Sequence, residues 1–231
     1  MPLLQRRHPS RCKGLVALKS TLPILYSFRR CPYAIRARLA LCLTKTTFIL
    51  REVSLKNKPQ ELTSCSPNAT VPCCLLPQDK VLTESLDIVD WATQCHSSWQ
   101  ETSDQQVVYQ TMLQALHQSM IPALMTYKYS ADLAERQQSY VMIQQFLVSI
   151  ENSIQGSFLQ GSNPLRLDVV IFPFVRQLVR INETDFFALP FSRVIDWYRT
   201  MTQLKVYDLV MQKHPVWQAG QADVIVAPAA A

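Results

Sequence analysis

Short β-like and helical stretches alternate between residues 24 and 96, and this alternation constrains the fold more than any other feature of the sequence. Runs of apolar and β-branched residues predict strands, while apolar residues spaced three or four apart predict helices. The order β-α-β, β-β-α implies a compact α/β unit of roughly 75 residues, since such elements pack as layers around one core. The predicted strands are residues 24–28, 48–53, 71–76 and 80–82, and the predicted helices are residues 32–43 and 84–94.

The second half of the chain has a different pattern. After Asp104 nearly all of it is predicted to be helical, and residues 168–181 and 187–202 are two of the expected helices. A polar stretch at 96–103 separates this half from the α/β unit. We therefore expect an all-α second domain of about five helices. The stripe of one core-facing helix is formed by Ile143, Leu147, Ile150 and Ile154.

Composition and charge exclude several classes of protein. The 231 residues are 48% hydrophobic and 17% charged, as in an ordinary globular chain. No apolar run reaches the roughly 18–20 residues that span a bilayer, so we expect a soluble protein. The net charge is +6, but ten of the 23 basic side chains and no acidic one lie in residues 1–50. This distribution favours an electropositive pocket for a small anion, with no nucleic-acid and no membrane partner.

Cysteine usage indicates the compartment. Seven cysteines at irregular spacing in a long chain argue against a secreted disulfide framework, so we expect a reducing, cytoplasmic setting. The sequence has no C-x-x-C and its four histidines are scattered, so we expect no metal site. Residues 1–21 are basic and lack the apolar core of a signal peptide. We expect them to be a disordered leader or the result of an upstream start codon, with a transit peptide as the alternative.

One cysteine has a distinctive setting. Cys31 follows the strand at 24–28 and the pair Arg29-Arg30, and Pro32 begins the next helix. Helix N-termini carry partial positive charge and unsatisfied N–H groups, and nearby arginines add positive charge. Both effects favour the thiolate, which is the reactive form of cysteine, so Cys31 is the candidate catalytic residue. The alternative interpretation is a merely buried residue at the start of a helix.

Three further features follow Cys31 in order along the α/β unit. Lys58 lies before the third strand, and Glu84-Ser85 opens the last helix of the unit. Val71-Pro72 begins the third strand, where a proline without an N–H suits a first strand position or a cis bond. Each feature has a simpler interpretation when it is taken alone. Lys58 can be solvated and Pro72 an ordinary trans proline, while the helix dipole alone favours an acid such as Glu84. Ser85 can be a simple cap.

Taken together, these features resemble the glutathione S-transferase superfamily, and most of all its cysteine-containing omega-like and bacterial members. The resemblance covers about residues 22–215, and its strings are 25–34 (LYSFRRCPYA), 66–72 (SPNATVP), 82–86 (LTESL) and 171–177 (IFPFVRQ). It implies an α/β thioredoxin-like N-terminal domain followed by an all-α helical C-terminal domain. The implied division is a leader at 1–21, a thioredoxin-like glutathione-binding domain at 22–96, a linker at 97–103, a helical domain at 104–215 and a tail at 216–231.

The resemblance implies how glutathione would be held. Lys58 matches the basic residue that reaches the glycine carboxylate of the tripeptide. Val71 matches the residue whose backbone pairs with the cysteinyl moiety, and Pro72 matches the cis-proline that fixes that edge. Glu84 and Ser85 match the pair that holds the γ-glutamyl end. Glutathione is thus the implied co-substrate, no metal is implied, and a homodimer is expected from the resemblance alone.

The resemblance also implies the chemistry. Cys31 matches the position that forms a mixed disulfide with glutathione, and Ala34 stands where a second cysteine would allow an internal disulfide. A monothiol mechanism follows, because only a second glutathione can then resolve the adduct. We expect a thiol transferase or oxidoreductase that acts on a small disulfide or electrophilic substrate. The alternatives are conventional conjugation of electrophiles, with Tyr26 or Ser27 as hydroxyl donor, and a non-catalytic interaction protein on the same fold.

Several positions depart from the family pattern. Cys73 and Cys74 stand where larger aliphatic residues are usual, and we expect both to be packing residues on opposite faces of a strand. Asn68-Ala69 stands where glycine is common just before the strand, and the turn at 77–80 lacks the usual Asp-Gly. Leu165 stands where a Ser or Thr usually caps a helix, a loss worth roughly 1 kcal/mol unless Asn163 substitutes. These departures leave reduced activity possible.

Overall fold

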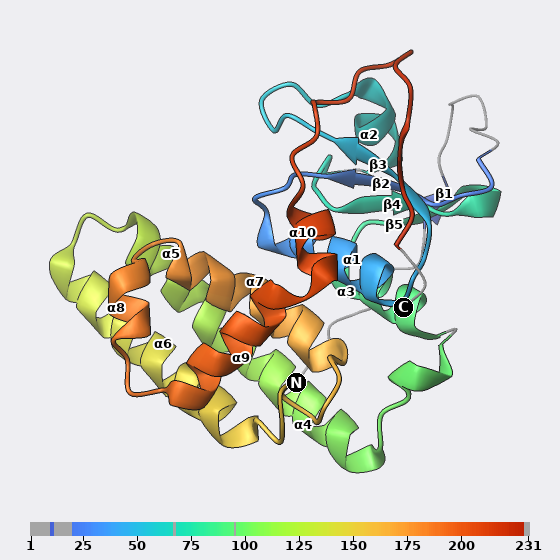
Figure 1. The fold of residues 1–231 in the computed structure, drawn as a ribbon. Helices are drawn as coiled ribbons and strands as arrows, with labels where there is room; N and C mark the ends of the chain where they lie inside the picture. Colours follow the sequence, from blue (N-terminus) through green and yellow to red (C-terminus); the bar gives the residue numbers. More distant parts are fainter. Residues whose placement is uncertain (1–9, 12–19, 67, 95, 229–231) are drawn as a thin grey trace. The chain divides into compact units, whose positions relative to one another are not determined.

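The computed structural model describes residues 10–11, 20–66, 68–94 and 96–228 (Figure 1). The chain divides into two units, one formed by residues 1–95 together with 209–231 and the other by residues 96–208. Most of the leader at 1–21 lies outside the described residues, so its expected disorder stays a prediction there. Ser10–Arg11 are described and pair with the strand at Lys80–Leu82, which corrects the expectation for these two residues.

A mixed β-sheet is the frame of the first unit. Its strands are β1 (Ser10–Arg11), β2 (Ile24–Ser27), β3 (Phe48–Glu52), β4 (Cys73–Leu75), β5 (Lys80–Leu82) and β6 (Val224–Val226). Within the described residues the sheet has six strands in the order β1-β5-β4-β2-β3-β6. β2 pairs in parallel with β3, and the other neighbours are antiparallel.

Three helices cover the two faces of this sheet. α1 (Pro32–Leu43) and α3 (Ser85–Gln94) lie on one face, and α2 (Gln60–Cys65) lies on the other (Figure 1). The predicted thioredoxin-like arrangement is therefore confirmed, since each predicted strand and helix of this unit is present and its ends lie within two residues of the prediction. α2 was not predicted, because six residues are too few to show a helical period.

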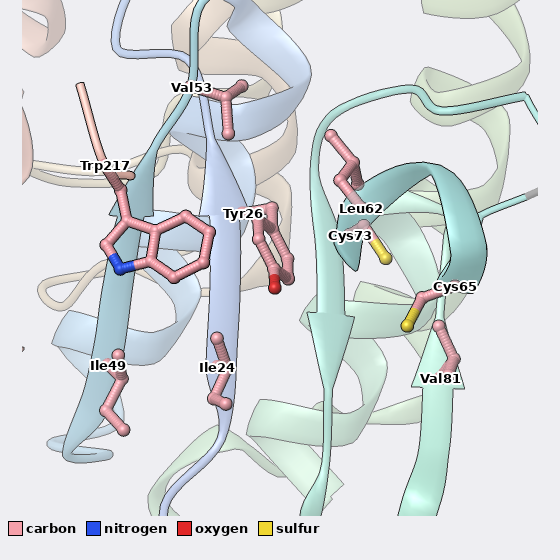
Figure 2. Close-up of a cluster of buried hydrophobic side chains, with 9 residues drawn as sticks. All are labelled: Ile24, Tyr26, Ile49, Val53, Leu62, Cys65, Cys73, Val81 and Trp217. Carbon is pink, nitrogen blue, oxygen red and sulfur yellow. The ribbon is translucent and has the colours of Figure 1, made fainter. Parts of the chain in front are cut away.

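A cluster of buried side chains fills the face of the sheet beneath α2 (Figure 2). Tyr26 of β2 lies at its centre, and its ring meets the edge of Trp217 with the centroids 6.1 Å apart. Cys73 is fully buried here, as expected for a small packing residue, and Cys74 is fully buried as well. The members of the cluster are Ile24, Tyr26, Ile49, Val53, Leu62, Cys65, Cys73, Val81 and Trp217.

The C-terminal segment corrects one expectation. We expected residues 216–231 to be a tail, but Trp217 packs in this cluster and β6 pairs with β3. The backbone N–H of Trp217 donates to the carbonyl of Glu52 at 2.8 Å. A strand of three residues and a single tryptophan carry too little periodicity to be recognised without the sheet edge that they join.

The second unit is built from helices. The segment Leu116–Met120 has π-helical hydrogen bonding and continues α4 into α5. α10 runs from the second unit into residues of the first. The helices are α4 (Ser103–Ala115), α5 (Ile121–Tyr129), α6 (Leu133–Ser153), α7 (Arg166–Val179), α8 (Glu183–Phe187), α9 (Ser192–Gln203) and α10 (Lys205–Met211).

The expected core stripe lies on α6 and at its C-terminal end. Ile143, Leu147 and Ile150 are fully buried, and Ile154 is 4% exposed. The predicted helix at 187–202 is wrong in its first part. The chain breaks at Pro190, which cannot continue a helix because it lacks an N–H, and α9 begins two residues later.

Asp168 takes the place of a side-chain cap at the start of α7. Leu165 provides no side-chain cap, as expected. Instead, the Asp168 carboxylate accepts the N–H of Leu165 at 2.9 Å, the N–H of Leu159 at 3.0 Å and the indole N–H of Trp197 at 2.8 Å. Complete burial still raises the pKa of Asp168 to about 6, against a usual value of 3.8.

Two residues of the first unit other than glycine adopt a left-handed backbone where a glycine was expected. Ala69 has φ of 46° and lies two residues before Val71, and Asp79 has φ of 61° in the turn before β5. Aspartate tolerates this region through local hydrogen bonding, whereas alanine gains no such compensation. Of these two departures from the family pattern, the one at Ala69 therefore places local strain in the backbone.

The first prediction concerns Asp168. Because the folded protein holds this proton more tightly than the unfolded chain, the free energy of unfolding should fall as pH rises from about 4 to about 6. The fall contributed by this group is roughly 1.4 kcal/mol for each unit of pKa elevation. Asp168→Asn should remove that component in urea unfolding curves measured across this range. The exposed Asp196→Asn is the control, and an identical pH dependence in wild type and Asp168→Asn contradicts the prediction.

The second prediction concerns Ala69. Replacing it by glycine removes the steric cost of a left-handed conformation, which is about 1–2 kcal/mol and exceeds the added backbone entropy of glycine. Ala69→Gly should raise the free energy of unfolding by about 0.5–1 kcal/mol in urea titrations. Ala134→Gly, in the exposed first turn of α6, is the matched control and should lower it. A loss of stability in both variants contradicts the prediction.

Candidate active site

Cys31 lies at the junction between β2 and α1. Its N–H donates to the carbonyl of Phe28 at 2.9 Å, which closes a tight turn, and its carbonyl accepts the N–H of Ile35 at 2.9 Å. Cys31 is therefore the N-cap residue of α1, although its side chain caps no N–H group. The thiol is half-buried, and its sulfur lies 3.7 Å from the carbonyl oxygen of Val71.

The segment before β4 approaches Cys31 from the other side. The Val71–Pro72 peptide is cis, and Pro72 is buried while Val71 is half-buried. The thiol can donate to the Val71 carbonyl from its position at the helix start. The structure thus brings together three of the residues that the sequence singled out.

Burial raises the pKa of the Cys31 thiol above its usual value, and this corrects the expectation of a favoured thiolate. The N–H groups of Ala34 and Tyr33 and the charge of Arg36 oppose the shift but do not reverse it. The expected effect of Arg29 and Arg30 is not found, since Arg36 is the only charged side chain among the causes that shift the Cys31 pKa. Arg29 donates to the carbonyl of Met211 at 3.5 Å, and Arg30 lies 5.2 Å from the Phe28 ring centroid.

Arg36 is the residue that the sequence analysis missed. It lies on α1, one and a half turns after Cys31, and is fully buried. Its Nη1 donates to the Ser85 hydroxyl at 3.4 Å, and its guanidinium carbon lies 5.4 Å from the centroid of the Tyr33 ring. Two arginines, Arg36 and Arg38, within a helix that is otherwise mostly apolar were the available signal, because such residues are buried only where they have partners.

Ser85 is linked to the surroundings of Cys31 through Arg36, and Glu84 through Tyr33. Ser85 begins α3 and is buried against Arg36, while Glu84 is exposed just before it. Tyr33 interacts electrostatically with both Cys31 and Glu84, and burial raises the pKa of its hydroxyl. α3 is thus joined to the start of α1 by polar contacts.

Lys58 lies apart from these contacts in the segment between β3 and α2. Its side chain is half-exposed, and among the described residues no hydrogen bond or ion pair joins it to Cys31. Its expected role in holding a carboxylate stays a prediction.

Tyr26 and Ser27 are poorly placed to act as hydroxyl donors to a ligand. Both residues are fully buried. The Tyr26 hydroxyl accepts from Nη1 of Arg51 at 2.8 Å, and the Ser27 hydroxyl accepts from Nε of Arg38 at 2.7 Å. Burial also raises the pKa of Tyr26. These contacts argue against the conjugation mechanism that the sequence left open.

The other described thiols are much less accessible than Cys31. Cys42, Cys73 and Cys74 are buried free thiols. Burial raises the pKa of Cys42 and of Cys73 to about 12, and that of Cys74 further still. Cys65 is disulfide-bonded, which the expectation of a reducing setting without a disulfide framework did not include.

The described residues form neither a metal site nor a membrane-spanning helix. In the part of the chain that the structure describes, no group of three or more His, Cys, Asp or Glu side chains could hold a metal ion. No described helix is both long enough and apolar enough to cross a membrane.

Comparison with known families agrees with the fold of the first unit. Residues 30–94 match the family model for the N-terminal domain of glutathione S-transferases. No curated protein matches the chain. The matched residues include Cys31, the Val71–Pro72 peptide and the start of α3.

Solved structures extend the similarity over both units. An omega 3C glutathione transferase from Trametes versicolor is 16% identical and covers 84% of this chain and 90% of its own, with a TM-score of 0.72. A glutathione transferase from Pseudomonas putida, with one glutathione disulfide bound per subunit, is 19% identical over 85% of this chain and 93% of its own, with a TM-score of 0.72. A tau-class enzyme from mango is 19% identical over 83% and 93%, also with a TM-score of 0.72. Residues 30–94 are thus similar to the N-terminal domain of glutathione S-transferases, and the chain shares the fold of these solved glutathione transferases.

Proposed function

We propose that this protein is a glutathione-dependent thiol transferase with Cys31 as its nucleophile. The observation that carries the proposal is the setting of Cys31. It is the half-exposed thiol at a helix start, 3.7 Å from the Val71 carbonyl, whereas the other described free thiols are buried. An accessible thiol next to backbone groups can be reached by a peptide thiol.

The surrounding residues suit the two ends of glutathione. In our proposal the backbone of Val71, fixed by Pro72, pairs with the cysteinyl part, while Glu84 and Ser85 hold the γ-glutamyl end and Lys58 the glycine carboxylate. Structures with the same fold support this choice of co-substrate. A Pseudomonas fluorescens family member has two glutathione molecules bound, and the Pseudomonas putida enzyme has glutathione disulfide bound.

The proposed reaction has two thiol–disulfide exchanges. The Cys31 thiolate attacks the glutathione sulfur of a mixed disulfide, the S–S bond breaks, and the substrate sulfur leaves as a thiolate. A second glutathione thiolate then attacks the glutathionyl sulfur on Cys31, which releases glutathione disulfide and restores the Cys31 thiolate. Ala34 offers no internal thiol for the second step. No metal takes part in this scheme.

The protonation state of Cys31 sets the pH dependence of the first step. Because burial raises its pKa, the resting residue is mostly the thiol at neutral pH, and its reactivity grows as pH rises. Arg36 and the N–H groups at the helix start limit this rise in pKa. They are therefore the groups that keep Cys31 usable as a nucleophile.

We propose a homodimer in the cytoplasm, where glutathione is available as the reductant. The acceptor is a small disulfide or electrophile. In our proposal Cys31→Ala loses disulfide reduction. Conjugation of electrophiles that survives in Cys31→Ala would instead favour the alternative mechanism, with Tyr26 or Ser27 as hydroxyl donor. A non-catalytic role on the same fold would show as a Kd for glutathione weaker than the millimolar range.

A third prediction tests the nucleophile. Treatment of the protein with glutathione disulfide should give one glutathione adduct, located on Cys31 by peptide mass spectrometry. Cys42→Ala, which removes a buried thiol from the same helix, is the matched control and should still form the adduct. Cys31→Ala should form none. The proposal is contradicted if glutathione modifies Cys73 or Cys95 while Cys31 stays unmodified.

A fourth prediction tests Arg36. Arg36→Met removes the positive charge that lowers the pKa of Cys31, so that pKa should rise further. The rate of iodoacetamide alkylation at pH 8 should fall by about three- to tenfold, since one pKa unit changes the thiolate fraction about tenfold. Arg36→Lys keeps the charge and should lie closer to wild type. Equal alkylation profiles for Arg36→Met and wild type, with circular dichroism unchanged, contradict the assignment.

A further inference from the structure

A buried ion pair in the first unit lies beside the Cys31 turn. Arg38 of α1 donates from Nη2 to Oε2 of Glu52 at the end of β3, and their side chains are 1% and 9% exposed. Buried charges persist only where their remaining polar atoms are also satisfied. The other hydrogen bonds of Arg38 and Glu52 therefore show which parts of the chain this ion pair holds in place.

The second carboxylate oxygen of Glu52 holds the turn that carries Cys31. Oε1 accepts the backbone N–H of Arg29 at 2.7 Å. Arg29 lies inside the turn that the Cys31 N–H closes on the Phe28 carbonyl. A single carboxylate thus bonds both the backbone that precedes Cys31 and the helix that follows it.

Arg38 extends this arrangement to both sides of the turn. Its Nε donates to the Ser27 hydroxyl at 2.7 Å, at the last residue of β2. Its Nη1 donates to the carbonyl of Val210 at 3.0 Å. The strand before Cys31 and the helix after it are therefore fixed to one guanidinium group.

The backbone of Glu52 cannot shift to relax these contacts. Glu52 stands opposite Ser27 in the parallel pairing of β2 and β3. Its carbonyl also accepts the N–H of Trp217 at 2.8 Å. The carboxylate is thus held from the sheet side while it bonds the turn.

We propose that Glu52 is a positioning residue for Cys31, whose carboxylate fixes the turn at 28–31 and so places the thiol at the start of α1. The proposal uses the proposed function only in taking Cys31 as the reactive residue. Glu52 does not touch the thiol, and its charge is not among the causes that shift the Cys31 pKa. It acts through Arg29 and Arg38.

The experiment compares Glu52→Gln and Glu52→Asp with wild type. Alkylation of Cys31 by iodoacetamide, followed by peptide mass spectrometry between pH 6 and 10, reports how well the helix start stabilises the thiolate and needs no glutathione. If the turn at 28–31 loosens in a variant, the Cys31 thiol moves away from the N–H groups of Tyr33 and Ala34, which lower its pKa. The profile of Glu52→Gln should therefore move to higher pH, with the rate at pH 8 lowered about threefold or more.

Controls separate positioning from charge and from stability. Asp223→Asn removes a carboxylate that pairs with Arg51 at 3.3 Å in the same unit and should leave the profile unchanged. Removal of a nearby negative charge alone would move the profile to lower pH, the opposite direction. Amide exchange should also lose protection at Arg29 and Cys31.

Every outcome decides the proposal. If Glu52→Gln does not fold, Glu52→Asp decides, because it keeps the charge beside Arg38 but draws the second oxygen away from the Arg29 N–H. A folded variant with an unchanged profile, or with a profile moved to lower pH, overturns the positioning role. Loss of the glutathione adduct on wild-type Cys31 would overturn the proposed function and leave this result standing.

Discussion

The pairing of Arg38 with Glu52 is the interaction on which the first unit depends, because neither charge can return to water without opening the core. Burial of a single charge costs several kcal/mol, so each partner requires the other. Their remaining bonds run to Ser27, to the Arg29 N–H and to Val210. The end of β2, the Cys31 turn, α1 and the end of α10 are therefore held as one assembly.

Burial also decides the character of Cys31. A helix start and a cationic neighbour favour the thiolate, but desolvation is the larger effect and raises the pKa. What distinguishes Cys31 from Cys42 or Cys73 is thus access combined with polar neighbours, rather than a low pKa. The buried thiols have neither access nor comparable stabilisation, which is why their pKa rises to about 12.

Local signals in the sequence were enough for much of the fold and part of the site. Strand β2, helix α1 and the position of Cys31 at the helix start follow from apolar spacing and from Pro32, all within twenty residues. The identity of the cation beside the thiol did not follow. Arg29 and Arg30 are nearer in sequence, but a helix turn carries Arg36 inward, and only packing against Ser85 shows this. Glu52 was missed for the same reason, since it lies 23 residues from Arg29.

The first unit is not complete within one continuous stretch of chain. Arg51 of β3 bonds the Tyr26 hydroxyl, pairs with Asp223 at 3.3 Å and lies 4.0 Å from the Trp217 ring centroid. A fragment ending near residue 96 would leave this arginine, only 4% exposed, without two of its three partners. It would also remove Val210 from Arg38. The C-terminal segment therefore supports the same two strands that position Cys31, and a division of the chain by sequence order alone cannot describe this unit.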